Sequence, residues 1–346
     1  MKKKRLFYLD FIRMIATVSI LITHFNALYI YMVPKMLEKS IITSYIGNIY
    51  IGSWGVSLFF IISGSSLMYV YQDGLELKSF YKKRFLSIYP MFWIAYIIAF
   101  LALFLKNQTL PGGGVPKYRF LLTIFGFDGL LSSAIPTFYL LGEWFLGAII
   151  LLYILFPLLR KLMNEHPIAL GVGVMVIYLM FVIFYKAPYP LSTIIFVRLP
   201  EILFGMYMVK YKFKIKWPVA VASFLIIVAN TILQPELVET IQTTYIGIAS
   251  FIILVYVSNF FARFKGIGWF SSLISKYSYA IFLVHHVLIH EIAAQFDLQG
   301  ISVLKSYILF AAICMVIAIA SKLLYELHKT MMKTYRDIYA QQSTKE

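Results

Sequence analysis

Stretches of about twenty mostly apolar residues recur along the whole of this 346-residue chain. About 20 apolar residues cross the hydrocarbon core of a bilayer as a helix, which satisfies its own backbone polar groups. Such stretches therefore predict an all-α polytopic membrane bundle of about ten transmembrane helices. The predicted spans are 7–32, 46–72, 86–106, 137–160, 168–185, 192–210, 217–234, 241–262, 272–293 and 302–328.

The positive charges predict the orientation of these spans. Of 31 Lys and Arg residues, 22 fall in the terminal segments and loops on one side and 7 in those on the other side. Cytoplasmic loops carry this excess, so we predict that both termini are cytoplasmic. The net charge of +16 is thereby explained by topology, and no nucleic-acid partner is expected.

One membrane domain accounts for almost the whole chain. We assign residues 1–330 to it and residues 331–346 to a cytoplasmic C-terminal tail, with a disordered end at 340–346. The longest outer loop, 107–136, is either a lid or a simple surface connection. Its apolar patch at 120–127 is too short to span and is predicted to lie in the interface or to re-enter the membrane. The single Cys314 excludes a disulfide framework and is expected to be a core residue.

Two polar residues lie on one face of the first apolar stretch. Arg13 and His24 are eleven residues apart, which is close to three helical turns and about 16 Å along the axis. Asp10 and Thr17 share that face. A cation and an imidazole are costly inside a bilayer, so each is a candidate functional residue. The structural alternative for Arg13 is an ion pair with Asp10, which lies one helical turn away.

Glu143 is a candidate partner for His24. With the predicted topology, both lie towards the outer surface at similar depth. A carboxylate that accepts a hydrogen bond from one imidazole nitrogen makes the other nitrogen a better base. The alternative for His24 is a structural histidine held by hydrogen bonds. The alternative for Glu143 is a structural carboxylate that neutralises a buried arginine.

Further polar residues lie in the later spans. His285 and His286 are about 100° apart on a helix, so only one is expected to face the centre. His286 and His290 have metal-ligand spacing, but no further ligand motif accompanies them, so no metal is predicted. Arg198 and Glu201 can neutralise each other, and Glu326 can pair with Lys322 or Lys329.

A basic run, Lys82, Lys83 and Arg84, lies in the predicted inner loop at the start of the third span. Topology alone favours positive charge there, and these side chains also suit the phosphates of a cytoplasmic cofactor. The chain contains no phosphate-binding glycine loop and no dinucleotide fingerprint.

An ordered series of motifs resembles the integral-membrane acyltransferase family 3, whose members typically O-acylate cell-surface glycans. The resembling segments are Tyr8–Arg13 with His24, Phe59–Gly64, Lys82–Pro90, Tyr139–Phe145, Arg198–Gly205, Ser278–His285 and Tyr325–Glu326. Ser87 departs from the family, which usually has a further arginine in the basic motif.

The resemblance implies a multi-pass enzyme of the cell membrane, as in the bacterial plasma membrane. It implies acyl-CoA, most often acetyl-CoA, as donor and a hydroxyl of a surface or exported polysaccharide as acceptor. Other partners would be membrane lipid and separate polysaccharide assembly proteins. The catalytic residues would be His24, Glu143 and Arg13, with His24 acting as general base or transient acyl carrier. Residues expected at the donor are Arg13, Ser63, Lys82, Lys83 and Arg84, and residues expected at the acceptor are Asp10, Arg198, Glu201 and His285.

Two other functional classes fit the same polar residues. A transporter or flippase of a glycan or lipid-linked sugar also needs buried Arg, Glu and His along its pathway. A structural partner in a polysaccharide-export complex would tolerate substitution of His24. A basic donor site at the cytoplasmic face favours the enzyme.

Overall fold

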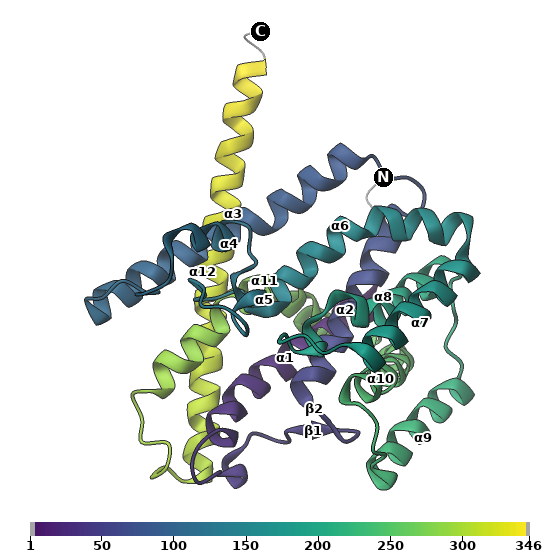
Figure 1. Ribbon diagram of the computed structural model, residues 1–346, viewed down its shortest axis with the longest axis horizontal. Coiled ribbons are helices and arrows are strands. Elements are labelled where there is room, and N and C mark those ends of the chain that lie inside the picture. The colour runs from purple at the N-terminus through teal and green to yellow at the C-terminus, as the bar shows by residue number, and fades with distance from the viewer. Residues whose placement is uncertain (1–3, 344–346) are drawn as a thin grey trace.

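The computed structural model describes residues 4–343, with the side chains of 4–338, as a bundle of helices (Figure 1). Its helices and strands are α1 (Phe7–Ile30), β1 (Tyr45–Ile46), β2 (Ile49–Tyr50), α2 (Ile51–Tyr71), α3 (Leu77–Asn107), α4 (Phe120–Ile124), α5 (Asp128–Leu131), α6 (Glu143–Glu165), α7 (Pro167–Phe184), α8 (Ile195–Lys210), α9 (Trp217–Leu233), α10 (Glu239–Phe261), α11 (Lys265–Ala293) and α12 (Val303–Ser343). The two strands form one short antiparallel hairpin. The predicted all-α membrane bundle is confirmed.

Each predicted span coincides with a helix. Within residues 4–343, eight helices are long and apolar enough to cross a membrane, namely α1, α2, α3, α6, α7, α10, α11 and α12. The other two, α8 and α9, have 16 and 17 residues, fewer than the about 20 that a crossing needs. The chain is thus a multi-pass membrane protein. Its described residues contain eight full-length candidate spans, and α8 and α9 are the shorter helices at the other two predicted spans.

Two helices begin later than predicted. Span two was expected from residue 46, but residues 45–50 form the hairpin, and its turn residues Gly47 and Asn48 have φ of 56° and 64°. Two successive positive φ angles are what a tight hairpin turn requires. Span four was expected from residue 137, but α6 begins at Glu143, directly after Gly142 with φ of 95°. Glu143 therefore lies at a helix N-terminus.

The outer loop is docked on the bundle. Its short helices α4 and α5 follow the glycine-rich stretch, and two side chains of α3 hold the loop by hydrogen bonds. Trp93 donates to the carbonyl oxygen of Ile124 at 3.0 Å, and Tyr89 donates to that of Phe125 at 3.1 Å. Gly129 packs so closely on α6 that a Cβ there would lie 2.7 Å from the backbone of Glu143.

The C-terminal helix extends far beyond the rest of the bundle. α12 has 41 residues, which is about 60 Å of helix and about twice the thickness of the hydrocarbon core. Figure 1 shows its yellow end above the other helices, at the opposite end of the bundle from the hairpin. The predicted disorder of 340–346 is wrong for 340–343, which are helical, and 344–346 lie outside the described residues.

Glycines allow α2 and α8 to touch through their backbones. A Cβ at Gly64 of α2 would overlap the carbonyl oxygen of Ile202 in α8. A Cβ at Gly205 of α8 would likewise overlap the carbonyl oxygen of Ile61, and Ser65 donates a hydrogen bond to the carbonyl oxygen of Gly205 at 3.1 Å. Small residues at helix contacts are typical of membrane bundles, where close packing replaces the hydrophobic effect.

We predict that Gly64→Ala destabilises the bundle, because the added methyl group meets backbone rather than a movable side chain. Overpacking of this kind costs about 1–3 kcal/mol. The thermal unfolding midpoint of the purified protein should therefore fall. Gly173→Ala is the matched control, since Gly173 of α7 has no atom within 4 Å of the position of a Cβ. Equal midpoints for both variants would contradict this account of the contact.

Candidate active site

A cavity of about 1070 Å³ runs through the bundle. On α2 its lining extends from Gly52 to Tyr71, a rise of about 28 Å that nearly matches the hydrocarbon thickness. Arg13 and Arg84 line it at the end that the charge bias predicts to be cytoplasmic, and Tyr31 and Tyr50 line it at the other end. The cavity is therefore long enough to connect the two faces of the membrane.

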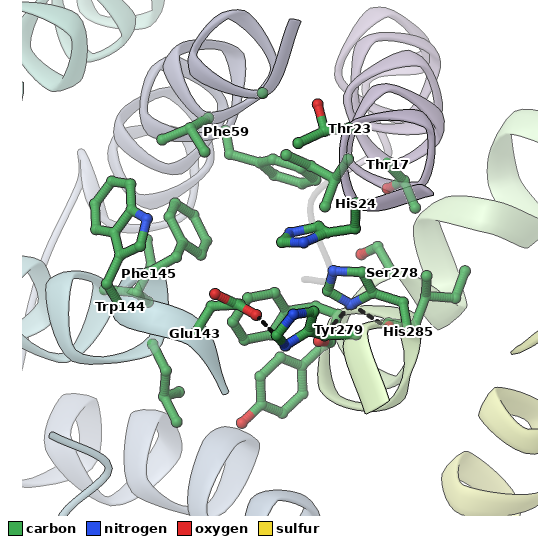
Figure 2. Close-up of a pocket in the computed structure, with 18 of the residues that line it drawn as sticks. Thr17, Thr23, His24, Phe59, Glu143, Trp144, Phe145, Ser278, Tyr279 and His285 are labelled. Carbon is green, nitrogen blue, oxygen red and sulfur yellow. Dashed lines mark hydrogen bonds and ion pairs between the residues drawn. The ribbon is translucent and has the colours of Figure 1, made fainter. Parts of the chain in front are cut away.

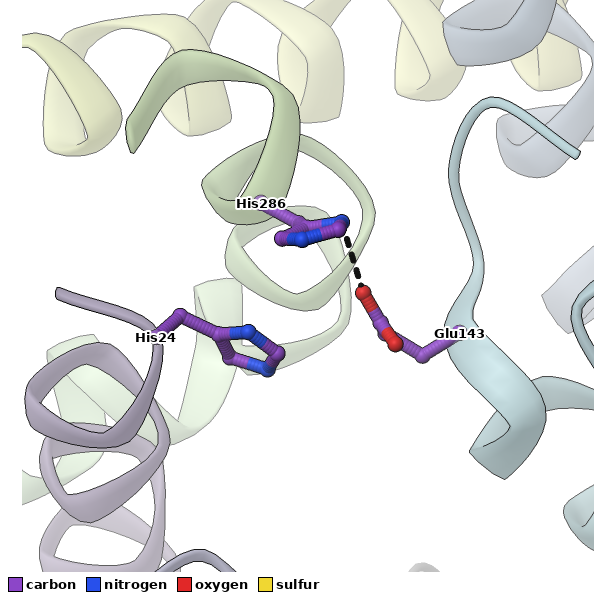
Figure 3. A group of neighbouring side chains, drawn as sticks. All are labelled: His24, Glu143 and His286. Carbon is purple, nitrogen blue, oxygen red and sulfur yellow. Dashed lines mark ion pairs between the residues drawn. The ribbon is translucent and has the colours of Figure 1, made fainter. Parts of the chain in front are cut away.

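His24, Glu143 and His286 meet in the outer half of this cavity. Nδ1 of His286 lies 2.8 Å from Oε1 of Glu143, and the rings of His24 and His286 have centroids 4.9 Å apart (Figure 3). The predicted proximity of His24 and Glu143 is thus confirmed. The direct hydrogen-bond partner of Glu143, however, is His286 and not His24.

The ring of His24 is available to a ligand. Among the side chains described, no hydrogen bond is made by either ring nitrogen of His24, and the ring projects from α1 into the cavity (Figure 2). An imidazole in this position can take a proton from a bound hydroxyl group or give one to a leaving group.

Tyr139 fixes the position of the Glu143 carboxylate. Its hydroxyl donates to Oε1 of Glu143 at 2.7 Å and lies 3.2 Å from Nδ1 of His286. Burial, together with the charge of Glu143, raises the pKa of Tyr139, so the phenol keeps its proton and remains a donor. Glu143 itself has φ of 33°, a left-handed conformation that is strained for a residue with a side chain. Such strain is commonly found at functional sites.

His285 also lines the cavity, so the expectation that only one of the adjacent histidines faces the centre is wrong. The cavity is wide enough for both rings, and the centroids of His24 and His285 are 4.8 Å apart. Nδ1 of His285 lies 2.8 Å from the carbonyl oxygen of Phe282, which requires a proton on that nitrogen. Nε2 of His285 is buried and has no partner within the described chain.

His24, Glu143 and His286 are also the residue types that could hold a metal ion. Their ligand atoms lie within 4.8 Å of one another. Two zinc ligands at about 2.1 Å from the ion are at most about 4.2 Å apart, so binding would require the group to contract. A hydrogen bond already explains the closest approach, between Glu143 and His286.

Arg13 is not paired with Asp10, in contrast to the structural alternative. Asp10 instead binds Arg5, whose Nε lies 2.6 Å from Oδ2 of Asp10, and accepts a hydrogen bond from Ser275 at 2.6 Å. The guanidinium group of Arg13 reaches the hydroxyl groups of Ser275 at 3.3 Å and Ser66 at 3.4 Å. No carboxylate among the described residues forms an ion pair with it.

The structure separates the remaining predicted residues. The large cavity is lined by Ser63, Arg84, Arg198 and His285. A second cavity, at the inner end of α1, is lined by Asp10 and Lys83. Arg13 lines both cavities. Lys82 and Glu201 line neither. The predicted pairs are confirmed, with Arg198 3.4 Å from Glu201 and Lys329 3.1 Å from Glu326.

A protein-family model described as an acyltransferase domain matches residues 6–326. The chain belongs to this acyltransferase family. The acyltransferase MdmB of Streptomyces mycarofaciens is 30% identical over 150 residues, which cover 38% of this chain and 36% of that protein. No solved structure matches the chain. The match confirms the motif resemblance, and membership of an acyltransferase family favours the enzyme over the transporter.

We call His24, Glu143 and His286, together with Tyr139, the histidine cluster. The sequence did not reveal the roles of His286 and Tyr139 in it. The sequence suggests metal-ligand spacing for His286 and an interior position for one of His285 and His286, but it does not indicate that His286 is the direct partner of Glu143. Tyr139 begins the motif that carries Glu143, four residues earlier, but its role depends on the non-helical path of 139–142. Nothing in the local sequence pattern reveals that path.

We predict that Glu143→Gln lowers the rate of acyl transfer by about 10²–10⁴-fold. The substitution removes the negative charge that stabilises a protonated ring of His24 or His286. The double variant Glu143→Gln/His286→Ala should be no slower than the slower of the two single variants, since the two residues act as a unit. Rates at saturating donor and acceptor provide the measurement.

Glu291→Gln is the control, because Glu291 is an acid of α11 that pairs with Lys106 outside the cavity. Multiplicative losses in the double variant would show that Glu143 and His286 act independently.

Proposed function

We propose that this acyltransferase moves an acyl group, most simply acetyl, from cytoplasmic acyl-CoA to a hydroxyl group of a cell-surface or exported polysaccharide. The observation that carries the proposal is the long cavity, with arginines at one end and a histidine–carboxylate cluster towards the other. Acyl-CoA remains in the cytoplasm, so an outer acceptor requires a path of this length. The cell membrane is the corresponding location.

The inner end of the cavity suits an anionic donor. The guanidinium group of Arg13 donates hydrogen bonds only to hydroxyl groups among the described residues, and Arg84 lies beside aromatic rings, 5.4 Å from the ring centroid of Tyr153. A guanidinium group without a carboxylate partner is suited to phosphate and carbonyl oxygens.

The outer end suits a sugar. Tyr31, Tyr50 and Trp144 line it, together with small polar residues such as Ser53. Aromatic faces pack against the apolar face of a sugar ring, while hydroxyl groups bind its polar edge.

In the proposed reaction, a ring nitrogen of His24 takes the proton from the acceptor hydroxyl. The oxygen attacks the thioester carbon, the carbon–sulfur bond breaks, and the CoA thiolate leaves and receives that proton. The negative charge of Glu143, bound to His286 beside His24, stabilises the transient imidazolium. In the alternative course, His24 carries the acyl group before transferring it to the acceptor.

We predict that His24→Ala lowers acylation of the surface polysaccharide by at least about 10²-fold, because it removes the proton acceptor. NMR of the isolated polysaccharide should show loss of ester signals at unchanged protein level. His166→Ala is the control, since His166 is exposed between α6 and α7. Full acylation in cells that carry His24→Ala would refute the proposed mechanism.

Arg13→Lys should also cause a severe loss, although it keeps the positive charge. The planar guanidinium group reaches hydroxyl groups on α2 and α11 at once, and an ammonium group cannot reproduce that fork. Transfer rates of the purified variant test this, with Arg336→Lys on the exposed end of α12 as control. Near-normal rates would show that Arg13 contributes only its positive charge and that the planar shape of its guanidinium group is not required.

A further inference from the structure

The two ring nitrogens of His285 have different surroundings. Nδ1 donates to the carbonyl oxygens of Phe282 at 2.8 Å and Ile281 at 3.1 Å, so this nitrogen carries the proton. Nε2 is therefore a lone-pair acceptor. It is buried without a partner among the described residues, on a side chain that lines the large cavity. A buried acceptor without a donor is costly, so a donor is expected to bind at Nε2.

Among the histidines, the ring closest to His285 is that of His24. Their centroids are 4.8 Å apart, whereas those of His285 and His286 are 6.4 Å apart. Figure 2 shows the two rings side by side, with the hydrogen bonds of His285 on the side away from His24. The atoms of an imidazole ring lie about 1.1 Å from its centroid. A rotation of the His24 ring can therefore bring an N–H within hydrogen-bond distance of Nε2.

Glu143 is the other acceptor beside His24, but it already has two partners. Its Oε1 accepts a hydrogen bond from Tyr139 at 2.7 Å and lies 2.8 Å from Nδ1 of His286. Nε2 of His285 has no partner within the described chain. The N–H of His24 therefore relieves the larger penalty when it binds to His285.

We propose that His285 is a positioning residue that holds His24 in its reactive tautomer, a role in catalysis that rests on the function proposed above. Nε2 of His285 accepts the N–H of His24, and the lone pair of the other His24 nitrogen then faces the cavity as the base. When that nitrogen takes the proton of the acceptor hydroxyl, the imidazolium keeps its hydrogen bond to His285. The proton in that bond stays on His24, and His285 remains neutral.

The arrangement follows the general pattern of an activated base. A catalytic base is oriented by a second group, which is itself held in place by a third. Here the base is His24, the second group is His285, and the third is the backbone of α11 at Phe282. The proposed role replaces the contact with the acceptor that was expected for His285.

Two amide variants separate the two nitrogens of His285. The amide of His285→Asn ends near the position of Nδ1 and can still donate to the backbone. The amide of His285→Gln reaches the position of Nε2 and can accept a hydrogen bond there. For His285→Asn we expect kcat to fall about 10–100-fold, the effect of losing one hydrogen bond to a charged group, at nearly unchanged KM for donor and acceptor. His285→Gln should restore most of the lost kcat.

Nitrogen-15 NMR of histidine-labelled, full-length protein in nanodiscs reads the tautomer without any substrate. The signals of His24 are assigned by their loss in His24→Ala. We expect one tautomer of His24 in the wild type and in His285→Gln, and a mixture of both tautomers in His285→Asn.

His328 of α12 provides the matched control. Its Nε2 is also buried without a partner in the described part of the chain, but His328 lines neither cavity. His328→Asn should leave both kcat and the His24 signals unchanged.

Three results would overturn the positioning role. The first is a His24 tautomer that does not change in His285→Asn, and the second is an equal loss of kcat in His285→Asn and His285→Gln. The third is a KM for the acceptor that rises at unchanged kcat, which would assign His285 to acceptor binding. Absence of transfer by the wild type would overturn the proposed function, while the tautomer measurement would still test the hydrogen bond.

Discussion

A guanidinium group inside a bilayer-spanning helix must be solvated or paired, and this constraint shapes the acyltransferase. Arg13 has only two serine hydroxyl groups as partners among the described residues, because Arg5 holds the nearby Asp10. An unpaired charge in hydrocarbon is costly, so Arg13 requires a polar space around it. The two cavities that share Arg13 provide that space.

The position of Glu143 in the histidine cluster depends on the outer loop, which packs against the N-terminus of α6. Gly129 packs against the backbone of Glu143, and Gly142 turns the chain so that α6 starts at this carboxylate. Glu143 thereby sits at a helix N-terminus, where negative charge is favoured, and faces histidines from α11 and α1. The outer loop, ambiguous from sequence, is thus part of the framework of the site.

Long-range periodic features could be predicted from the sequence, whereas features made by irregular backbone could not. Apolar length predicts the helices, and helical spacing places Arg13 and His24 on one face of α1. The hairpin at 45–50 and the late start of α6 depend on positive φ angles, which apolar patterning does not reveal. The pairing of Glu143 with His286 and the separation of Lys82 from Lys83 depend on how helices rotate against each other, which only tertiary packing decides.

In the proposed reaction, one cavity carries an acyl group from the inner face of the membrane to an acceptor at the outer face. Proteoliposomes with radiolabelled acetyl-CoA sealed inside and polysaccharide acceptor added only outside test it directly. We expect labelled ester on the external polysaccharide, which depends on the protein and is absent when His24 is replaced. Label that appears only when acetyl-CoA and acceptor share one compartment would contradict it.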